Sequence, residues 1–196
     1  ETGFAVKMRV GEGNRLVNCY SHDNIDDGYD LFNKIEDGPN GSVTIENSLS
    51  VHNGSNGFKL GGEGLPVAHV VRHNVAVENG MDGFTDNFNP GALVIESNRA
   101  VDNKRFNFLF RPSPYTTADK QGSFRDNLSL RTTPGKYDDA VSGNVDDSNY
   151  FYTGHHSVNS AGEIITPDNY LSLKLPEPLT RHADGAFNYQ HFLEKK

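Results

Sequence analysis

Apolar and polar residues alternate in short stretches along the chain, and residues 43–51 show the pattern clearly. Val43, Ile45, Leu49 and Val51 are apolar, and most of the residues between them are polar. A period of two is typical of a β-strand, so these four side chains are expected to face the interior of a β-structure. The pattern predicts short strands joined by polar turns.

These stretches recur along the chain and share two asparagines and a landmark pair. A leading Asn stands at positions 18, 47, 74, 98 and 127, which gives steps of 29, 27, 24 and 29 residues. A second Asn stands at positions 24, 53, 79 and 103, and the landmark follows it as Gly28-Tyr29, Gly57-Phe58, Gly83-Phe84 and Asn107-Phe108, with Gly3-Phe4 in an earlier coil. Steps of this length match one coil of a parallel β-helix.

The repeat predicts an all-β chain folded as a right-handed parallel β-helix, or solenoid. The alternative, an antiparallel sandwich, does not readily give one landmark in register through coils of unequal length. Stacked coils lie about 4.8 Å apart, and the recurrent Asn side chains are expected to form inward-facing ladders between them. The landmark Gly is expected to adopt a positive φ.

The domain is expected to consist of β-helix coils over residues 1–130 and an irregular C-terminal coil and capping tail over residues 131–196. A solenoid needs a cap where its repeats stop, so this tail is expected to fold over the last coil. The chain begins at Glu1 without an initiator Met, and no N-terminal cap is recognisable. We therefore expect a truncated N-terminus, with missing coils or another chain segment completing the solenoid.

Composition and charge exclude several classes of function. The net charge is −8, and Lys and Arg are not clustered, which argues against a nucleic-acid partner. The single cysteine, Cys19, excludes a disulfide within the chain and a cysteine-based metal site. No apolar run reaches the length of a membrane span.

Equivalent positions of neighbouring coils stack in columns, so candidate chemistry is sought across coils. Asp26 and Asp27 precede the landmark Gly28, and Asp30 follows it. Carboxylates placed in this way can converge on calcium, which takes about six to eight oxygen ligands. Lys59 occupies the position of Asp30 in the next coil, and its amine is a candidate base. Thr85 and Asp86 continue the column.

Three stretches in this order, GFAVKM at 3–8, NIDDGYDL at 24–31 and NGFKLGG at 56–62, resemble the family 9 polysaccharide lyases. The tail phrase Ala183-Asp-Gly185 is also similar to that family. The resemblance implies a parallel β-helix, β-elimination on a pectic polysaccharide, calcium held by aspartates and a lysine base. Carried over to this chain, it implies Asp26, Asp27 and Asp30 as calcium ligands and Lys59 as the base.

One position departs from the family pattern, because Thr2 stands where the family has an aspartate before Gly-Phe. A hydroxyl is a neutral and weaker calcium ligand, so Thr2 is expected to complete the site weakly, or Glu1 to substitute for it. Candidates for binding the carboxylates of neighbouring sugar units are arginines of the following coils, together with Asp86, unless they serve as surface charges. These arginines are Arg72, Arg99, Arg105 and Arg111.

The expected function is a pectic polysaccharide lyase that cleaves galacturonate-containing polymer by calcium-assisted β-elimination. Two alternatives stay open: a glycoside hydrolase of similar fold using Asp26 and Asp27, and a non-catalytic carbohydrate-binding β-helix. Homogalacturonan and rhamnogalacturonan are not distinguished. A bacterial protein that is secreted, periplasmic or on the cell surface is expected. Asp138–Asp139 and Asp146–Asp147 are expected to be solvated turn residues, and His155–His156 surface loop residues.

Overall fold

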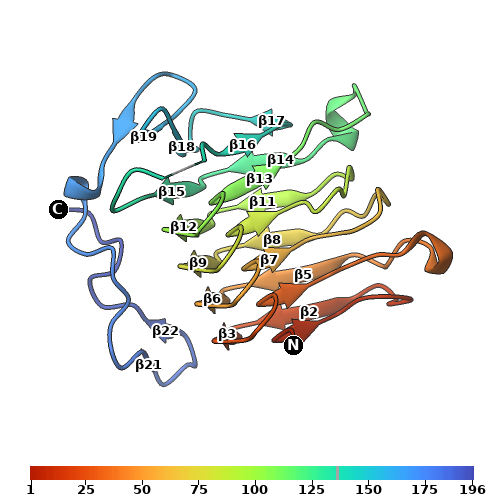
Figure 1. Cartoon of the computed structure of the whole chain (residues 1–196), viewed down its shortest axis with the longest axis horizontal. Coiled ribbons are helices and arrows are strands. Elements are labelled where there is room, and N and C mark those ends of the chain that lie inside the picture. Colours follow the sequence, from red (N-terminus) through yellow and green to blue (C-terminus); the bar gives the residue numbers. More distant parts are fainter. Residues whose placement is uncertain (136) are drawn as a thin grey trace.

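The computed structural model, which describes residues 1–135 and 137–196, is a parallel β-helix built from three sheets (Figure 1). Each of the first five coils contributes one short strand to each sheet, the last contributes to sheets A and B, and each strand pairs in parallel with its counterparts in adjacent coils. The fold class predicted from the repeat is therefore confirmed. Among the described residues, no helix combines the length and the apolar composition that crossing a membrane would require.

The three sheets run the length of the solenoid. Sheet A contains β1 (Phe4–Ala5), β4 (Tyr29–Asp30), β7 (Phe58–Lys59), β10 (Phe84–Thr85), β13 (Phe108–Phe110) and β16 (Ala140–Val141). Sheet B contains β2 (Asn14–Val17), β5 (Val43–Glu46), β8 (Val70–Arg72), β11 (Val94–Glu96), β14 (Ser123–Arg125) and β17 (Asn144–Val145). Sheet C contains β3 (Tyr20–His22), β6 (Leu49–Val51), β9 (Val75–Val77), β12 (Arg99–Val101) and β15 (Leu128–Leu130).

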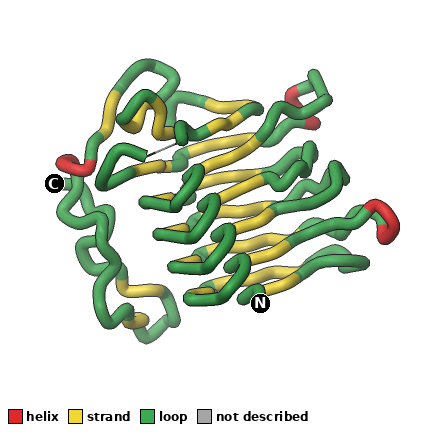
Figure 2. Tube along the Cα trace, in the orientation of Figure 1, coloured by secondary structure: helices red, strands yellow, loops and turns green. Residues whose placement is uncertain are grey.

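The loops that lead from sheet A to sheet B are the longest in each coil, and they project together on one side of the solenoid (Figure 2). Two of them carry the short 3-10 helices η1 (Ile35–Asp37) and η2 (Ala118–Lys120). These loops leave the carboxyl ends of the sheet A strands, so they border the outer face of that sheet.

The landmark aromatic residues form a stack of rings inside the solenoid. Ring centroids are 5.2 Å apart from Phe4 to Tyr29, 4.5 Å from Tyr29 to Phe58, 4.7 Å from Phe58 to Phe84 and 5.1 Å from Phe84 to Phe108. The predicted register of the landmark is confirmed, because these residues are direct partners across sheet A.

The reason for glycine at the landmark differs from the expected one. The backbone of Gly57 does not have a positive φ. A Cβ atom placed there would lie 2.6 Å from the carbonyl oxygen of Gly83 in the next coil, and one at Gly28 would lie 2.7 Å from that of Gly57. The expectation of a positive φ was wrong, and the position requires glycine because two coils approach each other closely.

Two buried asparagine ladders connect the coils at either end of sheet C. In the first, the backbone N–H of Asn74 donates to Oδ1 of Asn98 (3.0 Å), and that of Asn98 donates to Oδ1 of Asn127 (3.1 Å). The second ladder joins Asn24, Asn53, Asn79 and Asn103, as the repeat predicted. Each amide bonds backbone groups of the preceding coil and donates to the amide oxygen of the next one, as Asn98 does with Val71 and Asn127.

The leading asparagines of the first two coils are not part of the ladder. Asn18 and Asn47 have φ values of 55° and 49° and occupy the left-handed corner just before it, where His73 also stands (φ 56°). Ser48 takes the ladder position of its coil, since its N–H donates to Oδ1 of Asn74 (2.9 Å). The predicted alignment was therefore wrong by one residue in these two coils, because Asn suits both a left-handed corner and a buried ladder.

The side chains of β6 face a different way from the prediction. Val43 and Ile45 lie in the interior as expected, but Leu49 and Val51 point outward from sheet C into a second apolar cluster. This cluster is completed by tail residues such as Tyr170 and Phe192. The interior assignment of Leu49 and Val51 was wrong, because both faces of sheet C are covered.

The C-terminal tail first meets the last coil and then turns back along sheet C (Figure 1). The antiparallel strands β18 (Phe151–Thr153), β19 (His156–Val158) and β20 (Ile164–Ile165) follow a bridge between Leu128 and Tyr150. After η3 (Pro167–Asn169), the tail carries the hairpin β21 (Thr180–Arg181) and β22 (Phe187–Asn188). The ring of Phe187 reaches that of Tyr20 at 5.9 Å, so the tail covers the side of the solenoid as well as its last coil.

Candidate active site

The outer face of sheet A brings together the acidic residues and the lysine of the predicted column. Asp30 on β4 is the direct partner of Lys59 on β7, and Lys59 is the partner of Thr85 on β10. Because Tyr29 and Phe58 turn into the core, the next residue of each strand faces outward. Asp30 is nonetheless only 1% exposed, since neighbouring lysines cover it.

The Lys59 ammonium lies where two buried carboxylates converge. Its Nζ atom is 3.1 Å from Oδ2 of Asp27 and 3.5 Å from Oδ1 of Asp30. It also lies 5.1 Å from the centre of the Phe32 ring, within range of a cation–π contact. The side chain of Lys59 is 20% exposed, so the amine is held by protein on one side and accessible on the other.

Backbone donors fix both carboxylates. Oδ1 of Asp27 accepts hydrogen bonds from the backbone N–H (2.9 Å) and the side-chain amide (2.8 Å) of Asn56, and Oδ1 of Asp30 accepts one from the N–H of Phe32 (3.0 Å). These bonds leave Oδ2 of Asp27 directed at Lys59. The orientation of Asp27 is therefore set by the coil that follows, and that of Asp30 by its own coil.

A second ammonium that was not predicted, that of Lys7, reaches the same site. Its Nζ atom is in direct contact with Oδ2 of Asp30. Lys7 lies two residues beyond Ala5, the partner of Asp30 in the preceding coil, so it is displaced from the column. The only signal in the sequence is its place in the GFAVKM stretch. The site thus has two cations facing two buried carboxylates.

Asp26 and Thr2 lie at the edge of the same face. The Thr2 hydroxyl donates a hydrogen bond to Oδ2 of Asp26 (3.2 Å), and Asp26 is exposed. Within the described part of the chain, no three His, Cys, Asp or Glu side chains are grouped closely enough to hold a metal ion. The donors themselves, three carboxylates and a hydroxyl, are hard oxygen ligands of the kind that calcium prefers. The ammonium groups of Lys7 and Lys59 hold two of these carboxylates.

The electrostatics of the site favour a charged Lys59 when only protein groups are present. Burial by itself lowers the pKa of the Lys59 ammonium, but the carboxylates of Asp30, Asp27 and Asp26 outweigh it and raise that pKa above its ordinary value. An amine in this setting becomes a proton acceptor only when the negative charge around it is neutralised.

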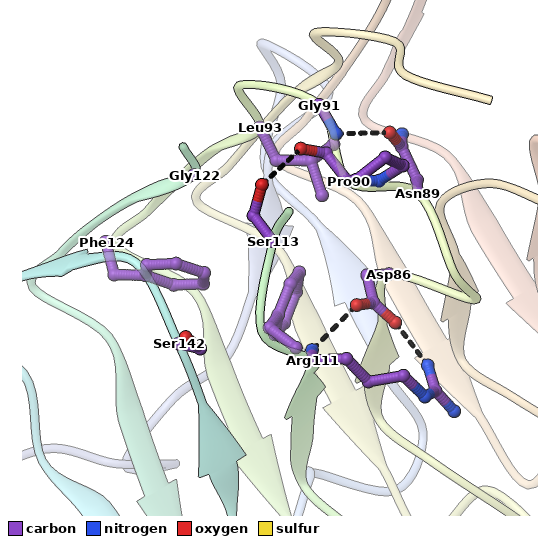
Figure 3. Close-up of a pocket in the computed structure, with 11 residues that line it drawn as sticks. Asp86, Asn89, Pro90, Gly91, Leu93, Arg111, Ser113, Gly122, Phe124 and Ser142 are labelled. Carbon is purple, nitrogen blue, oxygen red and sulfur yellow. Dashed lines mark hydrogen bonds and ion pairs between the residues drawn. The ribbon is translucent and has the colours of Figure 1, made fainter. Parts of the chain in front are cut away.

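A second polar group lies farther along sheet A and pairs two carboxylates with two arginines, and Figure 3 shows one of these pairs, Asp86 with Arg111. Nε of Arg105 is 3.3 Å from Oδ1 of Asp82, and the guanidinium of Arg111 is in direct contact with Asp86. The backbone N–H of Arg111 also donates to Oδ2 of Asp86 (2.7 Å). Burial raises the pKa of both Asp82 and Asp86, although the arginines oppose this effect.

Two of the predicted substrate-binding arginines lie on other faces. Arg72 is on β8 of sheet B and pairs with Glu46 at 3.0 Å, and Arg99 is on β12 of sheet C and pairs with Asp126 at 3.4 Å. The structure thus brings Arg105, Arg111 and Asp86 to the face of Lys59 and separates Arg72 and Arg99 from it. Counting coils along the chain does not reveal which of three sheets carries a residue.

Two buried ionisable groups lie away from this face. Asp139 was expected to be solvated, but its carboxylate accepts hydrogen bonds from the N–H groups of Asn107 (3.0 Å), Phe108 (3.0 Å) and Tyr152 (2.8 Å), and burial raises its pKa to about 6. His69 is fully buried and accepts a hydrogen bond at Nδ1 from the N–H of Val43 (3.0 Å). Asp139 therefore connects the start of β13 to β18, and His69 connects two neighbouring coils.

The chain is similar to known proteins in both sequence and structure. The family model described as "Pel9A-like, right handed beta helix region" matches residues 1–127. The "Pectate disaccharide-lyase" of Dickeya chrysanthemi is 70% identical over 149 residues, which cover 76% of this chain and 20% of that protein. The "Pectate lyase L" of Paenibacillus polymyxa (strain SC2) is 38% identical over 205 residues, covering 98% of this chain and 43% of that protein.

A solved structure has the same architecture. The crystal structure of pectate lyase Pel9A superposes with a TM-score of 0.75 and 27% sequence identity, and the match covers 100% of this chain and 47% of that one. The chain therefore spans less than half the length of these relatives.

Proposed function

We propose, because this chain belongs to the Pel9A-like family of right-handed β-helices, that its sheet A face is the active site of a lyase acting on pectic polysaccharide. The family assignment confirms the resemblance inferred from the three motifs. The observation that carries the proposal is the position of Lys59, whose amine is at once accessible and held at 3.1 and 3.5 Å from two buried carboxylates. The names of the relatives support a galacturonate-containing polymer as the substrate.

In the proposed reaction Lys59 is the base. Its Nζ atom takes the proton from C5 of the uronate, the electron pair of the C–H bond forms the C4–C5 double bond, and the bond from C4 to the glycosidic oxygen breaks. The glycosidic oxygen leaves with the electron pair of the broken C4–O bond and takes up one proton, which balances the proton removed from C5, so no water is consumed. The product carries an unsaturated sugar at its new end.

Calcium is proposed as the cofactor, held by Asp26, Asp27 and Asp30 with Thr2 at the edge. When bound, a divalent cation would neutralise these carboxylates and stabilise the negative charge that develops on the substrate carboxylate. Lys59 is positioned by its contacts with Asp27 and Asp30, and Asn56 holds Asp27 in place. Glu1 lies beside Thr2 as a further oxygen donor.

Arg105 and Arg111 are proposed to bind carboxylates of neighbouring sugar units, since guanidinium groups bind carboxylates well. Asp86 is proposed to act through Arg111, which it holds by two hydrogen bonds. Arg72 and Arg99 are not included, because they lie on the other sheets. A polymer substrate of this kind is also consistent with the proposed location outside the bacterial cytoplasm.

A hydrolytic mechanism is disfavoured by the state of Asp27. Its carboxylate is engaged by Asn56 on one oxygen and by Lys59 on the other, so it is not free to act as an acid or a base with Asp26. An inverting hydrolase needs two carboxyl groups about 6.5 to 9.5 Å apart with room for a water molecule between them. With both oxygens of Asp27 engaged, Asp26 and Asp27 do not form such a pair.

The test compares wild type, Lys59→Ala and a control variant, Lys34→Ala, on polygalacturonate in the presence of calcium. Lys34 is a half-buried lysine that pairs with Glu36 at 3.7 Å and, among the described residues, forms no ion pair with Asp27 or Asp30. We expect wild type and the control to form unsaturated product, measured by its near-ultraviolet absorbance, and Lys59→Ala to form none. New reducing ends without unsaturated product would instead show hydrolysis, and equal turnover in all three proteins would exclude Lys59 as the base.

A further inference from the structure

An exposed aromatic ring lies on the turn that follows β10, beside the proposed active site. Phe88 is 59% exposed and is the only exposed Phe or Tyr among residues 1–135 and 137–196. Its backbone has a φ of 67°, and that of Asn87 has a φ of 44°. A bulky side chain rarely adopts this left-handed conformation, which Asn or Gly would adopt more easily. The left-handed backbone also occurs at other corners of the solenoid, such as His73, so the exposed ring is the feature that folding does not explain.

The turn is held in place by specific hydrogen bonds. The N–H of Phe88 donates to Oδ1 of Asp86 (3.2 Å), and the N–H of Asn87 donates to the hydroxyl of Thr85 (3.2 Å). The side-chain amide of Asn87 donates to the carbonyl of Gly61 in the preceding coil (2.7 Å). These hydrogen bonds therefore fix the turn that holds the ring of Phe88 at the surface.

The ring and Arg111 line one groove. The guanidinium of Arg111 lies 3.9 Å from the centre of the Phe88 ring and is contacted by Asp86 through Nη1. In the part of the chain that is described, its other side-chain N–H groups donate to no protein acceptor. The groove has a volume of about 300 Å³ and is also lined by Gly64, Pro90 and Pro112. A groove with an apolar wall and unpaired cationic donors suits a ligand that has an apolar face and an anionic group.

The groove lies on the same side of the solenoid as Lys59. Thr85 is the last residue of β10 before this turn. It is the direct partner of Lys59 on one side and of Leu109 on the other. Arg111 follows Leu109, so the coil of Arg111 is two coil spacings, about 10 Å, from that of Lys59. A polymer that passes Lys59 along the axis of the solenoid therefore reaches Phe88 and Arg111 with a further unit.

We propose that Phe88 and Arg111 form a subsite for another uronate unit of the polymer bound at Lys59. The aromatic ring packs against the apolar C–H face of the sugar, and the free donors of Arg111 bind its carboxylate. This inference rests on the proposed function, since it assumes that the face of Lys59 binds a polyuronate. In this proposal Phe88 helps the protein to bind longer polymers more tightly and takes no part in the chemical step.

The test measures binding without turnover, in the Lys59→Ala background. Dissociation constants for digalacturonate and hexagalacturonate are determined by titration calorimetry in the presence of calcium. The parent, Lys59→Ala with Phe88 unchanged, is compared with three variants that carry in addition Phe88→Asn, Phe88→Tyr or Ile164→Asn. Ile164 is an exposed apolar residue of the tail and serves as the control. We expect Phe88→Asn to weaken hexamer binding about tenfold, with dimer binding unchanged, and Phe88→Tyr and Ile164→Asn to bind both as the parent does.

Thermal unfolding provides a second readout that separates recognition from stability. Phe88→Asn is expected to raise the melting temperature, because Asn accepts the left-handed backbone more readily. A lower melting temperature together with unchanged hexamer affinity would show that Phe88 serves the fold, through its contact with Arg111, and would overturn the subsite. Equal hexamer affinity in the parent and Phe88→Asn, or no hexamer binding by either, would also overturn it. A wild-type chain that forms no unsaturated product while length-dependent binding persists would overturn only the proposed lyase.

Discussion

Replacing Asn98 by alanine removes one rung of the buried asparagine ladder and is expected to destabilise the solenoid strongly. The side chain of Asn98 accepts hydrogen bonds from the N–H (3.0 Å) and the amide group (3.2 Å) of Asn74, and donates to the carbonyl of Val71 (2.8 Å) and to Oδ1 of Asn127 (3.2 Å). Each bond contributes about 1 kcal/mol net, and a buried N–H left without a partner costs about 1 to 3 kcal/mol. Since the N–H of Asn74 is left unpaired, we expect a loss of about 3 to 5 kcal/mol.

The matched control is Asn47→Ala, the same substitution at the exposed corner position of another coil. Asn47 makes no side-chain hydrogen bond among the described residues, and its left-handed backbone (φ 49°) costs alanine only about 1 to 2 kcal/mol. The free energy of unfolding is measured by urea denaturation, and amide exchange is followed at the N–H of Asn74, which should lose protection only in Asn98→Ala. Equal destabilisation by the two substitutions would refute the ladder assignment, as would full protection of Asn74 in Asn98→Ala.

Two further predictions concern the interior. Phe58→Ala is expected to cost about 4 kcal/mol, measured by urea denaturation, because its ring is fully buried between Tyr29 at 4.5 Å and Phe84 at 4.7 Å; a loss under about 1 kcal/mol would contradict the stacked core. Burial lowers the pKa of His69 to about 4, below its unfolded value, so the stability it contributes is present above about pH 6.5 and is lost as the pH falls toward 4. Between pH 7 and pH 4 wild type is therefore expected to lose about 3 kcal/mol more than His69→Asn, which keeps an acceptor for the N–H of Val43; parallel pH profiles would contradict this.

The features predictable from the sequence are those that every coil repeats. The Gly-Phe landmark predicted the register of sheet A, because a ring such as Phe58 must stack on the same position of the next coil. The same landmark also aligned Asp30 with Lys59, and these two residues are direct partners in the structure. Repetition made these positions comparable across coils of unequal length.

Features that depend on parts outside the repeat could not be predicted in this way. Alternation showed that Leu49 lies on a β-strand, but the C-terminal tail decides that its outward face is buried. Lys7 was missed because it reaches Asp30 from a position displaced from the column. Arg72 was grouped with Arg111 because the spacing of coils does not distinguish the three sheets.

The most direct test of an active site at Lys59 is the formation of unsaturated product from polygalacturonate by wild type and Lys59→Ala, each with calcium and with a chelator added. Elimination by wild type in calcium alone is expected, with no product from Lys59→Ala under either condition and with binding of hexagalacturonate retained by that variant. Product formation by Lys59→Ala at the wild-type rate would contradict the assignment of the base. Undiminished activity of wild type in the chelator would contradict the role of calcium at Asp26, Asp27 and Asp30.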